Sequence, residues 1–386
     1  MKQRNLHRSS ILTFHFLRNA FLLTLSVFFL PALLLLGSAQ AADASFEAGA
    51  ASSWETPASS DAADASASPQ PDTSETDTSA ASKQGKPTTN APIPAAAASA
   101  QTLTVLVGDK VQTMGLEDYL WGVVAAEMPA TFEQEALNAQ AIAARTYTLY
   151  RMASPSPNHS KASICTDSGC CQAWVSYSDR LKGWEKSKRS EYSKKITTAI
   201  QKTQGLAMFY QDKPIMAAFH AASAGVTKSA KTVWGKDVPY LQSVSSPETK
   251  QQVPKYYSVV TVSKAKFCEA LRITYPNLTL PQDPSNWFGK VIYDGSGLPH
   301  AIRIGSQTVP TATLRTLFGL RSPSVTAEWD GKQVRFYVTG YGHGVGMSQY
   351  GANALAKQGK SWQEILTWYY SGTDVENLAD KNLDLG

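Results

Sequence analysis

Apolar residues recur at helical spacing in some segments between residues 102 and 378 and alternate in others. Helical spacing predicts helices over 116–128, 131–151, 187–202, 311–318 and from 361 to Gly372. Capping-box patterns begin the second of these at Thr131 and the last at Ser361. Alternation and β-branched residues predict strands over 102–107, 112–114, 206–210, 215–219, 257–262 and 334–338. Because helices and strands follow each other irregularly, the predicted fold class is α+β, with two lobes around a cleft and the second lobe at about 245–335.

The first 41 residues have the pattern of a signal peptide or an N-terminal membrane anchor. Residues 1–20 contain four basic residues and no acid, and residues 21–37 are almost purely apolar. Ala39-Gln40-Ala41 fits a small-x-small cleavage site, but the apolar run is also near the minimum length for a membrane span. Both interpretations stay open. Both predict an extracytoplasmic protein that is secreted or anchored in the cell membrane through this segment.

Residues 42–101 consist mainly of Ala, Ser, Thr, Pro and Asp, which predicts a disordered linker. Residues 102–378 form the predicted folded domain. In the whole chain of 386 residues, 43% are hydrophobic and four are cysteines, which excludes a collagen, a coiled coil and a disulfide scaffold. The part after the linker holds 30 basic and 23 acidic residues, a charge that suits an anionic wall polymer or lipid headgroups. No nucleic-acid partner is expected.

Glu127 is the strongest candidate for a catalytic residue. It continues the apolar face of the 116–128 helix, whereas Glu117 and Asp118 lie on the polar face. Burial raises the pKa of a carboxyl group, and a carboxyl group that is neutral near pH 7 can act as a general acid. A structural alternative is that Glu127 pairs with Arg145 or Arg151 of the next helix. Arg145, on an inward face, would in that case only brace the two helices.

A loop with one histidine and three cysteines is a candidate metal site. His159, Cys165, Cys170 and Cys171 fall within 13 residues, and four such ligands suit tetrahedral zinc with a structural role. The alternative outside the cytoplasm is a disulfide from Cys165 to Cys170 or Cys171. Cys268 stands apart and is interpreted as a small buried apolar residue.

The chain ends in a glycine-rich segment, Gly342-His343-Gly344-Val345-Gly346, followed by Gln349. It lacks the residues of a phosphate-binding loop, so we interpret it as a turn that presents His343 and Gln349 to a cleft. A purely structural role is the alternative for His343. His220 could pack in the core at the end of a strand, or line a cleft together with Ser223. A Ser-His hydrolase is disfavoured because there is no nucleophile elbow.

Several motifs together resemble the stage II sporulation protein D family, also called SpoIID/LytB. They lie in order between residues 102 and 375: Glu117-Asp118-Tyr119-Leu120, Ala126-Glu127-Met128-Pro129, Gln140 to Tyr147, Cys165 to Trp174, Ala224 to Thr227, Trp234 to Leu241, and Gly342 to Ala352. The resemblance implies a peptidoglycan lytic transglycosylase that cleaves denuded glycan strands between MurNAc and GlcNAc and leaves 1,6-anhydroMurNAc ends. It places this activity in forespore engulfment, beside a partner amidase and other engulfment proteins.

Within this resemblance, Glu127 matches the catalytic glutamate, and the loop of His159, Cys165, Cys170 and Cys171 matches a zinc site of some members. Position 170 would more often be His, so the departure leaves the disulfide alternative open. The chemistry itself needs no cofactor, because one carboxyl group can act first as acid and then as base. Residues with expected roles in substrate binding or orientation are Arg145, Tyr147, Ser223, Tyr240, His343 and Gln349. The competing function is a non-catalytic wall-binding enhancer of an N-acetylmuramoyl-L-alanine amidase.

Overall fold

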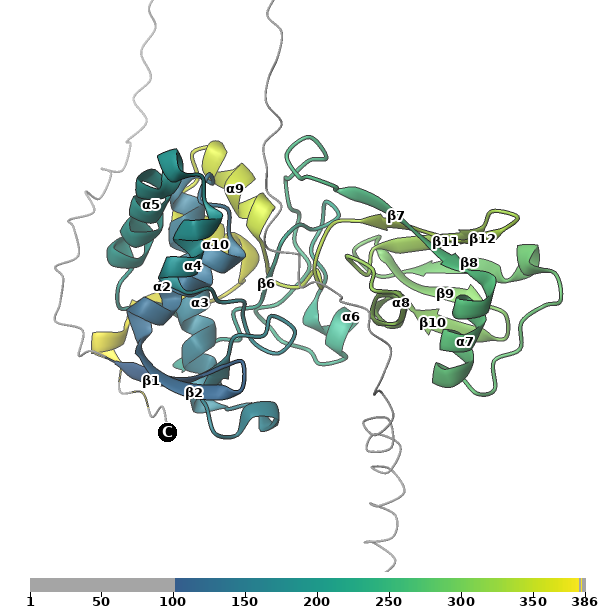
Figure 1. The fold of residues 1–386 in the computed structure, drawn as a ribbon, viewed down its shortest axis with the longest axis horizontal. Helices are drawn as coiled ribbons and strands as arrows, with labels where there is room; N and C mark the ends of the chain where they lie inside the picture. Colours follow the sequence, from purple (N-terminus) through teal and green to yellow (C-terminus); the bar gives the residue numbers. More distant parts are fainter. Residues whose placement is uncertain (1–100, 382, 384–386) are drawn as a thin grey trace, which may run out of the picture. The chain divides into compact units, whose positions relative to one another are not determined.

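The computed structural model describes residues 101–381 and 383 (Figure 1). The predicted signal or anchor segment and the linker up to residue 100 lie outside the described residues. The described part is a mixed α+β fold with two hydrophobic cores, as the sequence predicts. No helix in residues 101–381 is both long and apolar enough to cross a membrane.

The first lobe contains most of the helices and is built from two stretches of the chain. Its first stretch comprises β1 (Thr102–Val107), β2 (Lys110–Gly115), α2 (Leu116–Glu127), α3 (Gln134–Ala153), η1 (Pro157–His159), β3 (Ile164–Cys165), α4 (Tyr177–Gly183), η2 (Lys186–Lys188), α5 (Arg189–Lys202), β4 (Leu206–Tyr210), β5 (Lys213–Pro214), β6 (Phe219–His220) and α6 (Ala230–Trp234). The second stretch comprises β13 (Met347–Ser348), α9 (Gln349–Lys357), α10 (Trp362–Tyr369), β14 (Asp374–Asn377) and η4 (Leu378–Asp380).

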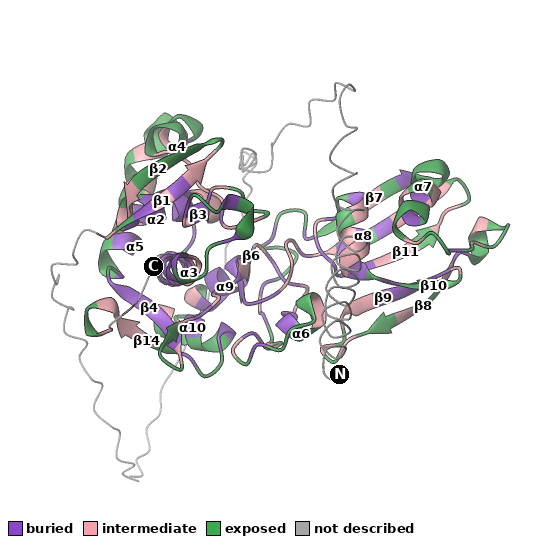
Figure 2. Cartoon of the chain, turned by 90° about the horizontal axis from the view of Figure 1, so that it is seen from below, coloured by how far each residue is buried: buried purple, intermediate pink, exposed green. Residues whose placement is uncertain are grey.

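Helix α3 is the centre of this lobe. It contacts α2, α5, α9, α10 and β4, and Figure 2 shows most of it buried. Its buried face is rich in alanine, and such small side chains let neighbouring helices approach closely. The lobe also contains the short sheets β2-β1-β3, β14-β4-β5 and β13-β6. In the last of these, residues 219–220 and 347–348 pair in parallel, which brings the glycine-rich segment back to the first stretch.

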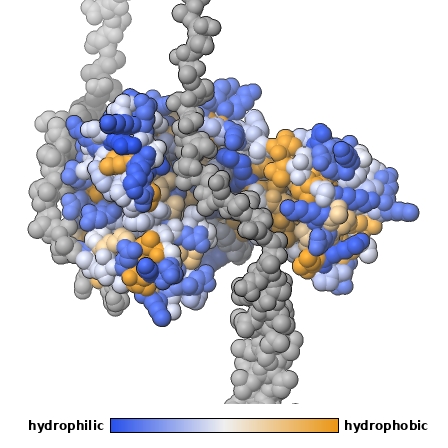
Figure 3. All heavy atoms as spheres, viewed as in Figure 1, coloured by the Kyte–Doolittle hydropathy of each residue, from blue (hydrophilic) through white to orange (hydrophobic). Residues whose placement is uncertain are grey.

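The second lobe, from Tyr257 to Thr339, contains most of the longer strands. Its elements are β7 (Tyr257–Ser263), α7 (Lys264–Thr274), η3 (Pro284–Asn286), β8 (Phe288–Tyr293), β9 (Pro299–Ile304), β10 (Gln307–Pro310), α8 (Thr311–Phe318), β11 (Val325–Trp329) and β12 (Gln333–Thr339). Two antiparallel sheets, β11-β12-β7 and β10-β9-β8, enclose a core in which Phe318 stacks on both Phe267 and Phe336. Apolar side chains also reach its surface, including exposed Tyr257 and Val259, and Figure 3 shows hydrophobic patches on this lobe.

Three details of the prediction from sequence are wrong. Helix α3 begins at Gln134 with no side-chain cap, and the N–H of Glu133 instead donates to Asn353, so Thr131 caps nothing. Residues 215–218 form no strand; only Phe219 and His220 pair. The second lobe begins about twelve residues later than expected, at β7, because the segment before β7 packs into the first core through Val253 and Tyr256.

Candidate active site

Glu127 is the last residue of α2, and its carboxyl group is turned toward the protein. The side chain is half-buried, and Oε1 accepts a hydrogen bond of 2.7 Å from the backbone N–H of Ala173. Among residues 101–381 no cation pairs with it. The alternative that Glu127 pairs with Arg145 or Arg151 is therefore wrong.

The surroundings of Glu127 favour the neutral acid. Burial raises the pKa of Glu127 from its usual 4.5 to about 7, although hydrogen bonding from Ala173 and from Gln349 acts in the opposite direction. Gln349 is itself buried, and its amide also donates to Gln140 at 3.3 Å. The structure thus brings Gln349 next to Glu127, while its expected role in binding substrate stays a prediction. Near neutral pH a large fraction of Glu127 carries a proton.

Arg145 has a structural position. Its side chain is fully buried, and its guanidinium makes a two-bond ion pair with Glu117 at 3.0 and 2.6 Å. The remaining nitrogen donates to the carbonyl groups of Thr203 and Leu206. The expectation that Arg145 binds substrate is wrong, because the group is sealed from solvent and its donors are occupied. It ties α2 and α3 to the loop that precedes β4.

The four candidate metal ligands come together. His159, Cys165, Cys170 and Cys171 present ligand atoms that all lie within 4.8 Å of one another. The Sγ atoms of Cys170 and Cys171 are 3.9 Å apart, and Nε2 of His159 is 3.2 Å from Sγ of Cys171. Tetrahedral zinc with bonds of about 2.3 Å to sulfur and 2.0 Å to nitrogen needs ligand separations close to these. The geometry and the donor set therefore fit a closed zinc site.

Two further features of this cluster suit a metal. Nδ1 of His159 lies 3.0 Å from the carbonyl oxygen of Ala162, which directs Nε2 toward the cysteines. All four cysteines of the chain are free thiols in the structure.

Tyr147 packs against the same loop, with its hydroxyl 3.5 Å from the carbonyl oxygen of Cys170. Tyr147 therefore supports the cluster on the side of α3.

Ser223 belongs to a buried carboxylate centre instead of an open cleft. Its backbone N–H and its hydroxyl both donate to Oε1 of Glu248 at 2.7 Å, and Ser348 donates to the same oxygen at 2.6 Å. Ser246 donates to the other oxygen and also contacts Tyr369. Since Ser223 is buried and its hydroxyl is committed to Glu248, the prediction that it binds substrate is wrong.

Tyr240 lies half-buried beside the β4-β5 hairpin. Its hydroxyl accepts a hydrogen bond from the N–H of Met216 at 3.1 Å, and its ring lies 5.5 Å from that of Tyr210. These contacts place it in the wall of the first lobe. The structure shows no contact between Tyr240 and Glu127, and a role in substrate binding stays a prediction.

His343 sits in a cluster of rings at the glycine-rich turn. Its ring lies 5.6 Å from that of His220 and 5.5 Å from that of Trp234. Nδ1 of His343 accepts from the N–H of Val345, while Nδ1 of His220 lies 3.1 Å from the carbonyl oxygen of Val345. Burial lowers the pKa of His343 to about 3 and that of His220 to about 4, so both rings are neutral at pH 7.

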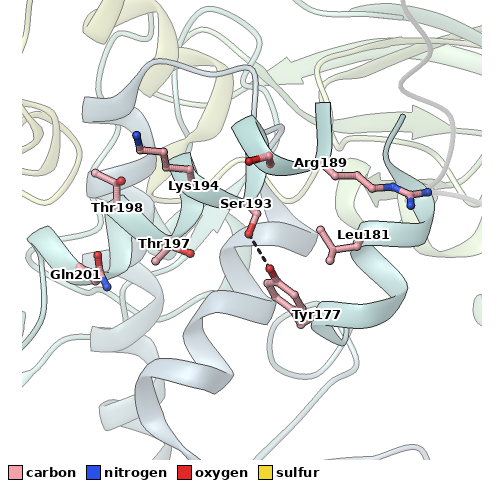
Figure 4. A pocket seen from close by; sticks show the side chains of 9 residues that line it. Tyr177, Leu181, Arg189, Ser193, Lys194, Thr197, Thr198 and Gln201 are labelled. Atoms are coloured by element: carbon pink, nitrogen blue, oxygen red, sulfur yellow. Dashed lines mark hydrogen bonds between the residues drawn. The ribbon is translucent and has the colours of Figure 1, made fainter. Parts of the chain in front are cut away.

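Two hollows lie on the surface of the first lobe. One, of about 520 Å³, lies between α4 and α5, where the hydroxyl groups of Tyr177 and Ser193 are 3.1 Å apart (Figure 4). The other, of about 540 Å³, lies beside Trp121 and Trp174 and also touches Tyr177. Glu127 lines neither of them. We therefore base the site on the chemistry around Glu127 and not on the size of a hollow.

The fold and the site define a mixed α+β protein with a carboxyl group of raised pKa beside a four-ligand cluster. A family model described as "SpoIID: Stage II sporulation protein" matches residues 108–210, which include both features. Stage II sporulation protein D of Bacillus subtilis (strain 168) is 39% identical over 267 residues, covering 69% of this chain and 75% of that protein. The protein of the same name from Bacillus amyloliquefaciens is 38% identical over the same shares. The chain belongs to the stage II sporulation protein D family.

A third relative has another name. The amidase enhancer of Bacillus subtilis (strain 168) is 28% identical over 307 residues, covering 66% of this chain and 40% of that protein. Membership of the family supports a role in sporulation, and the family relationship suggests an enzyme related to the cell wall.

Prediction from sequence missed several groups that shape the site. The N–H of Ala173 is a backbone group, and no side-chain pattern could have indicated it. Glu248 lies outside any periodic segment, although three serines surround it in the structure. Arg315 was placed on a helix but was not considered for function; the available indication was that it shares the helical spacing of the buried residues Thr311, Leu314 and Phe318.

Proposed function

We propose that this protein is a lytic transglycosylase that cleaves peptidoglycan glycan strands between MurNAc and GlcNAc and leaves 1,6-anhydroMurNAc ends. The observation that supports the proposal most is the position of Glu127: an inward carboxyl group that has one backbone N–H donor and no cationic partner among the described residues. A salt-bridged glutamate would be ionised and could not donate a proton. We also propose a role in forespore engulfment, which the similarity to stage II sporulation protein D supports.

In the first step, protonated Glu127 transfers its proton to the bridging oxygen while the bond from that oxygen to C1 of MurNAc breaks. The leaving sugar departs as a neutral alcohol, and positive charge develops on C1 and the ring oxygen. Glu127 is now a carboxylate, which the N–H of Ala173 stabilises through the bond of 2.7 Å. Gln349 acts in the same direction.

In the second step, the oxygen of the C6 hydroxyl group of MurNAc attacks C1, and its proton passes to the carboxylate of Glu127. The new C6–O–C1 bond closes the anhydro ring, the acid is regenerated, and no water is consumed. A second carboxylate is not required, unlike in most hydrolytic glycosidases. The interactions that set the pKa of Glu127 involve no other carboxyl group among residues 101–381.

Zinc would be held by His159, Cys165, Cys170 and Cys171, where it would supply structural cross-linking only, because a closed four-ligand site leaves no position for substrate. The proton transfers remain with Glu127.

The decisive experiment compares the wild type with Glu127→Gln on purified glycan strands without stem peptides, with anhydro ends counted by mass spectrometry. Glu133→Gln is the matched control, because Glu133 is an exposed glutamate six residues further along. We expect release by the wild type and the control and at least a 100-fold loss in Glu127→Gln. Equal release by Glu127→Gln would refute the catalytic assignment. Reducing ends labelled in ¹⁸O-water would indicate hydrolysis instead.

The relative named amidase enhancer supports a second candidate function, in which the protein binds the wall and stimulates an amidase without cutting glycan. This function needs no acid at position 127. It would be supported if wild type and Glu127→Gln released no anhydro ends, yet both raised the rate at which a purified N-acetylmuramoyl-L-alanine amidase removes stem peptides.

A further inference from the structure

Two guanidinium groups without acidic partners lie around Tyr341, at the start of the glycine-rich turn. The guanidinium carbon of Arg321 lies 4.0 Å from the ring centroid of Tyr341, a cation–π contact. Arg315, on α8, is close enough to Tyr341 for the two to interact electrostatically. Both arginines are half-buried, and each has a buried Nε with no hydrogen-bond partner within residues 101–381. The two side chains therefore meet at one place from different parts of the second lobe.

The neighbours of these arginines are other basic groups. The positive charge of Arg315 contributes to the low pKa of both His220 and His343. In the part of the chain that the structure describes, no acid lies within 4.0 Å of either guanidinium. The two fully buried cations of the described residues do have such partners: Arg145 has Glu117, and Lys228 has Asp294 at 2.9 Å. Half-buried positive charge without compensation is costly in a folded protein, and an anionic ligand would remove this cost.

The place is connected to Glu127 through a short series of contacts. The backbone carbonyl of Arg321 accepts a hydrogen bond of 2.8 Å from the N–H of Gly342. The guanidinium group of Arg321 also interacts electrostatically with Tyr350. Tyr350 directly follows Gln349, the residue that interacts with Glu127. His220 pairs with Ser348 across β6 and β13, one residue before Gln349. The arginine pair thus borders the segment that positions the catalytic acid.

We infer that Arg315 and Arg321 bind the free carboxylate of the D-lactyl group on MurNAc and so select glycan from which the stem peptide has been removed. The fork of an arginine matches the two oxygens of a carboxylate, and two arginines can hold one carboxylate from two sides. A stem peptide converts this carboxylate to a neutral amide, which offers no charge to the pair. This inference rests on the proposed function, because it names two specificity-determining residues for the same site.

The test measures binding to the inactive variant Glu127→Gln by calorimetry, so that no ligand is cleaved. The two probes are a (GlcNAc–MurNAc)₂ tetrasaccharide with free lactyl carboxylates and the same tetrasaccharide with these groups converted to methylamides. We expect the carboxylate form to bind at least about tenfold more tightly. Arg315→Gln or Arg321→Gln, added to Glu127→Gln, should remove most of this preference. Arg272→Gln, at an exposed arginine of α7, should keep it.

The ratio between the two probes separates recognition from folding, because a damaged fold weakens both probes alike. Arg321→Lys keeps the positive charge over Tyr341 but loses the paired N–H donors of the guanidinium group. It should therefore retain a reduced preference for the carboxylate probe, even if Arg321→Gln does not fold. Equal binding of both probes to Glu127→Gln would overturn the inference, as would arginine variants that lower both affinities by the same factor. Absence of anhydro product from the wild type would refute the proposed function while leaving this binding comparison interpretable.

Discussion

The backbone N–H of Ala173 donates to the carboxyl group of Glu127 at 2.7 Å, and Ala173 follows Cys171 by two residues. Two residues after Ala173, the same segment contacts α2 again: the N–H of Val175 donates to the carbonyl of Gly122 at 3.3 Å. Cys171 is fixed in turn by a bond of 2.7 Å from its N–H to the carbonyl of Asp167. The cysteine loop and the acid therefore form one structural unit.

Loss of the cluster should disturb the acid as well as the fold. We expect Cys171→Ser to lower the free energy of unfolding by about 2 kcal/mol or more, since structural zinc sites contribute folding energy directly. Glycan cleavage should fall further than the folded fraction does, because Ala173 loses its fixed position. Urea unfolding and anhydro-end release measure the two effects, and Cys268→Ser, at a cysteine outside the cluster, is the matched control.

Metal content decides the chemistry of the cluster. The native protein should contain one zinc per chain by mass spectrometry and show one reactive thiol, that of Cys268, until a chelator exposes the other three. A metal-free protein with two thiols instead would indicate a disulfide and contradict the zinc assignment.

The raised pKa of Glu127 predicts an unusual dependence of stability on pH. The folded protein holds this proton with a pKa of about 7, against a usual value of 4.5, so the folded state binds more protons between these values. The resulting stability is fully present below pH 4.5 and is lost as pH rises through 7, by at most about 3 kcal/mol. The glutamine of Glu127→Gln does not ionise, so this variant does not lose stability in this way as pH rises. It should be more stable than the wild type at pH 8 but not at pH 4.5.

Urea unfolding of both proteins at pH 4.5, 6, 7 and 8 checks this prediction, because other titrating groups cancel in the difference. Glu133→Gln should follow the wild type at every pH, since Glu133 is exposed. Cleavage by the wild type should decline above about pH 7 as the acid ionises. A constant difference between wild type and Glu127→Gln would show that Glu127 keeps an ordinary pKa.

The hydrophobic pattern predicted the helices around the site well. Apolar spacing and Pro129 placed α2 correctly, and Ser361 with Glu364 forms the predicted capping box of α10. These elements are encoded by residues close together in the chain. Thr131 shows the limit of such local rules: it has the residue type of a cap, but Asn353 from a distant helix satisfies the start of α3 instead.

Partners of buried polar groups could not be predicted in the same way. The inward face of Arg145 was recognised from helical spacing, yet its partner, Glu117, was assigned to the polar surface. Ser223 was assigned to a cleft because nothing near it in the sequence indicates Glu248, which lies 25 residues away. Such pairings depend on which segments meet in three dimensions, and periodicity within a single segment does not contain that information.

Arg145 should therefore contribute to stability and not to substrate recognition. We expect Arg145→Met to destabilise the protein by about 3–5 kcal/mol, because it leaves Glu117 and two buried carbonyl groups without their donor. The exposed pair Lys360–Glu364 is the control, and Lys360→Met should cost less than about 1 kcal/mol. A normal unfolding curve for Arg145→Met together with weakened glycan binding would restore the binding role.

Gly346 should tolerate no side chain, and this gives a direct test of the turn beside Glu127. Its φ is +71°, and a Cβ atom there would lie 2.0 Å from the carbonyl oxygen of Ala218. That oxygen already accepts hydrogen bonds from the N–H of Met347 and the hydroxyl of Tyr370, so it cannot move without breaking the pairing of β6 with β13. We expect Gly346→Ala to lower the free energy of unfolding by about 3 kcal/mol or more. Gly225 has a φ of +88° and open space around it, so Gly225→Ala should lower it by only about 1–2 kcal/mol, the cost of alanine in the left-handed conformation. Urea unfolding of the two variants separates steric conflict from backbone strain, and equal losses would mean that the turn can shift away from Ala218.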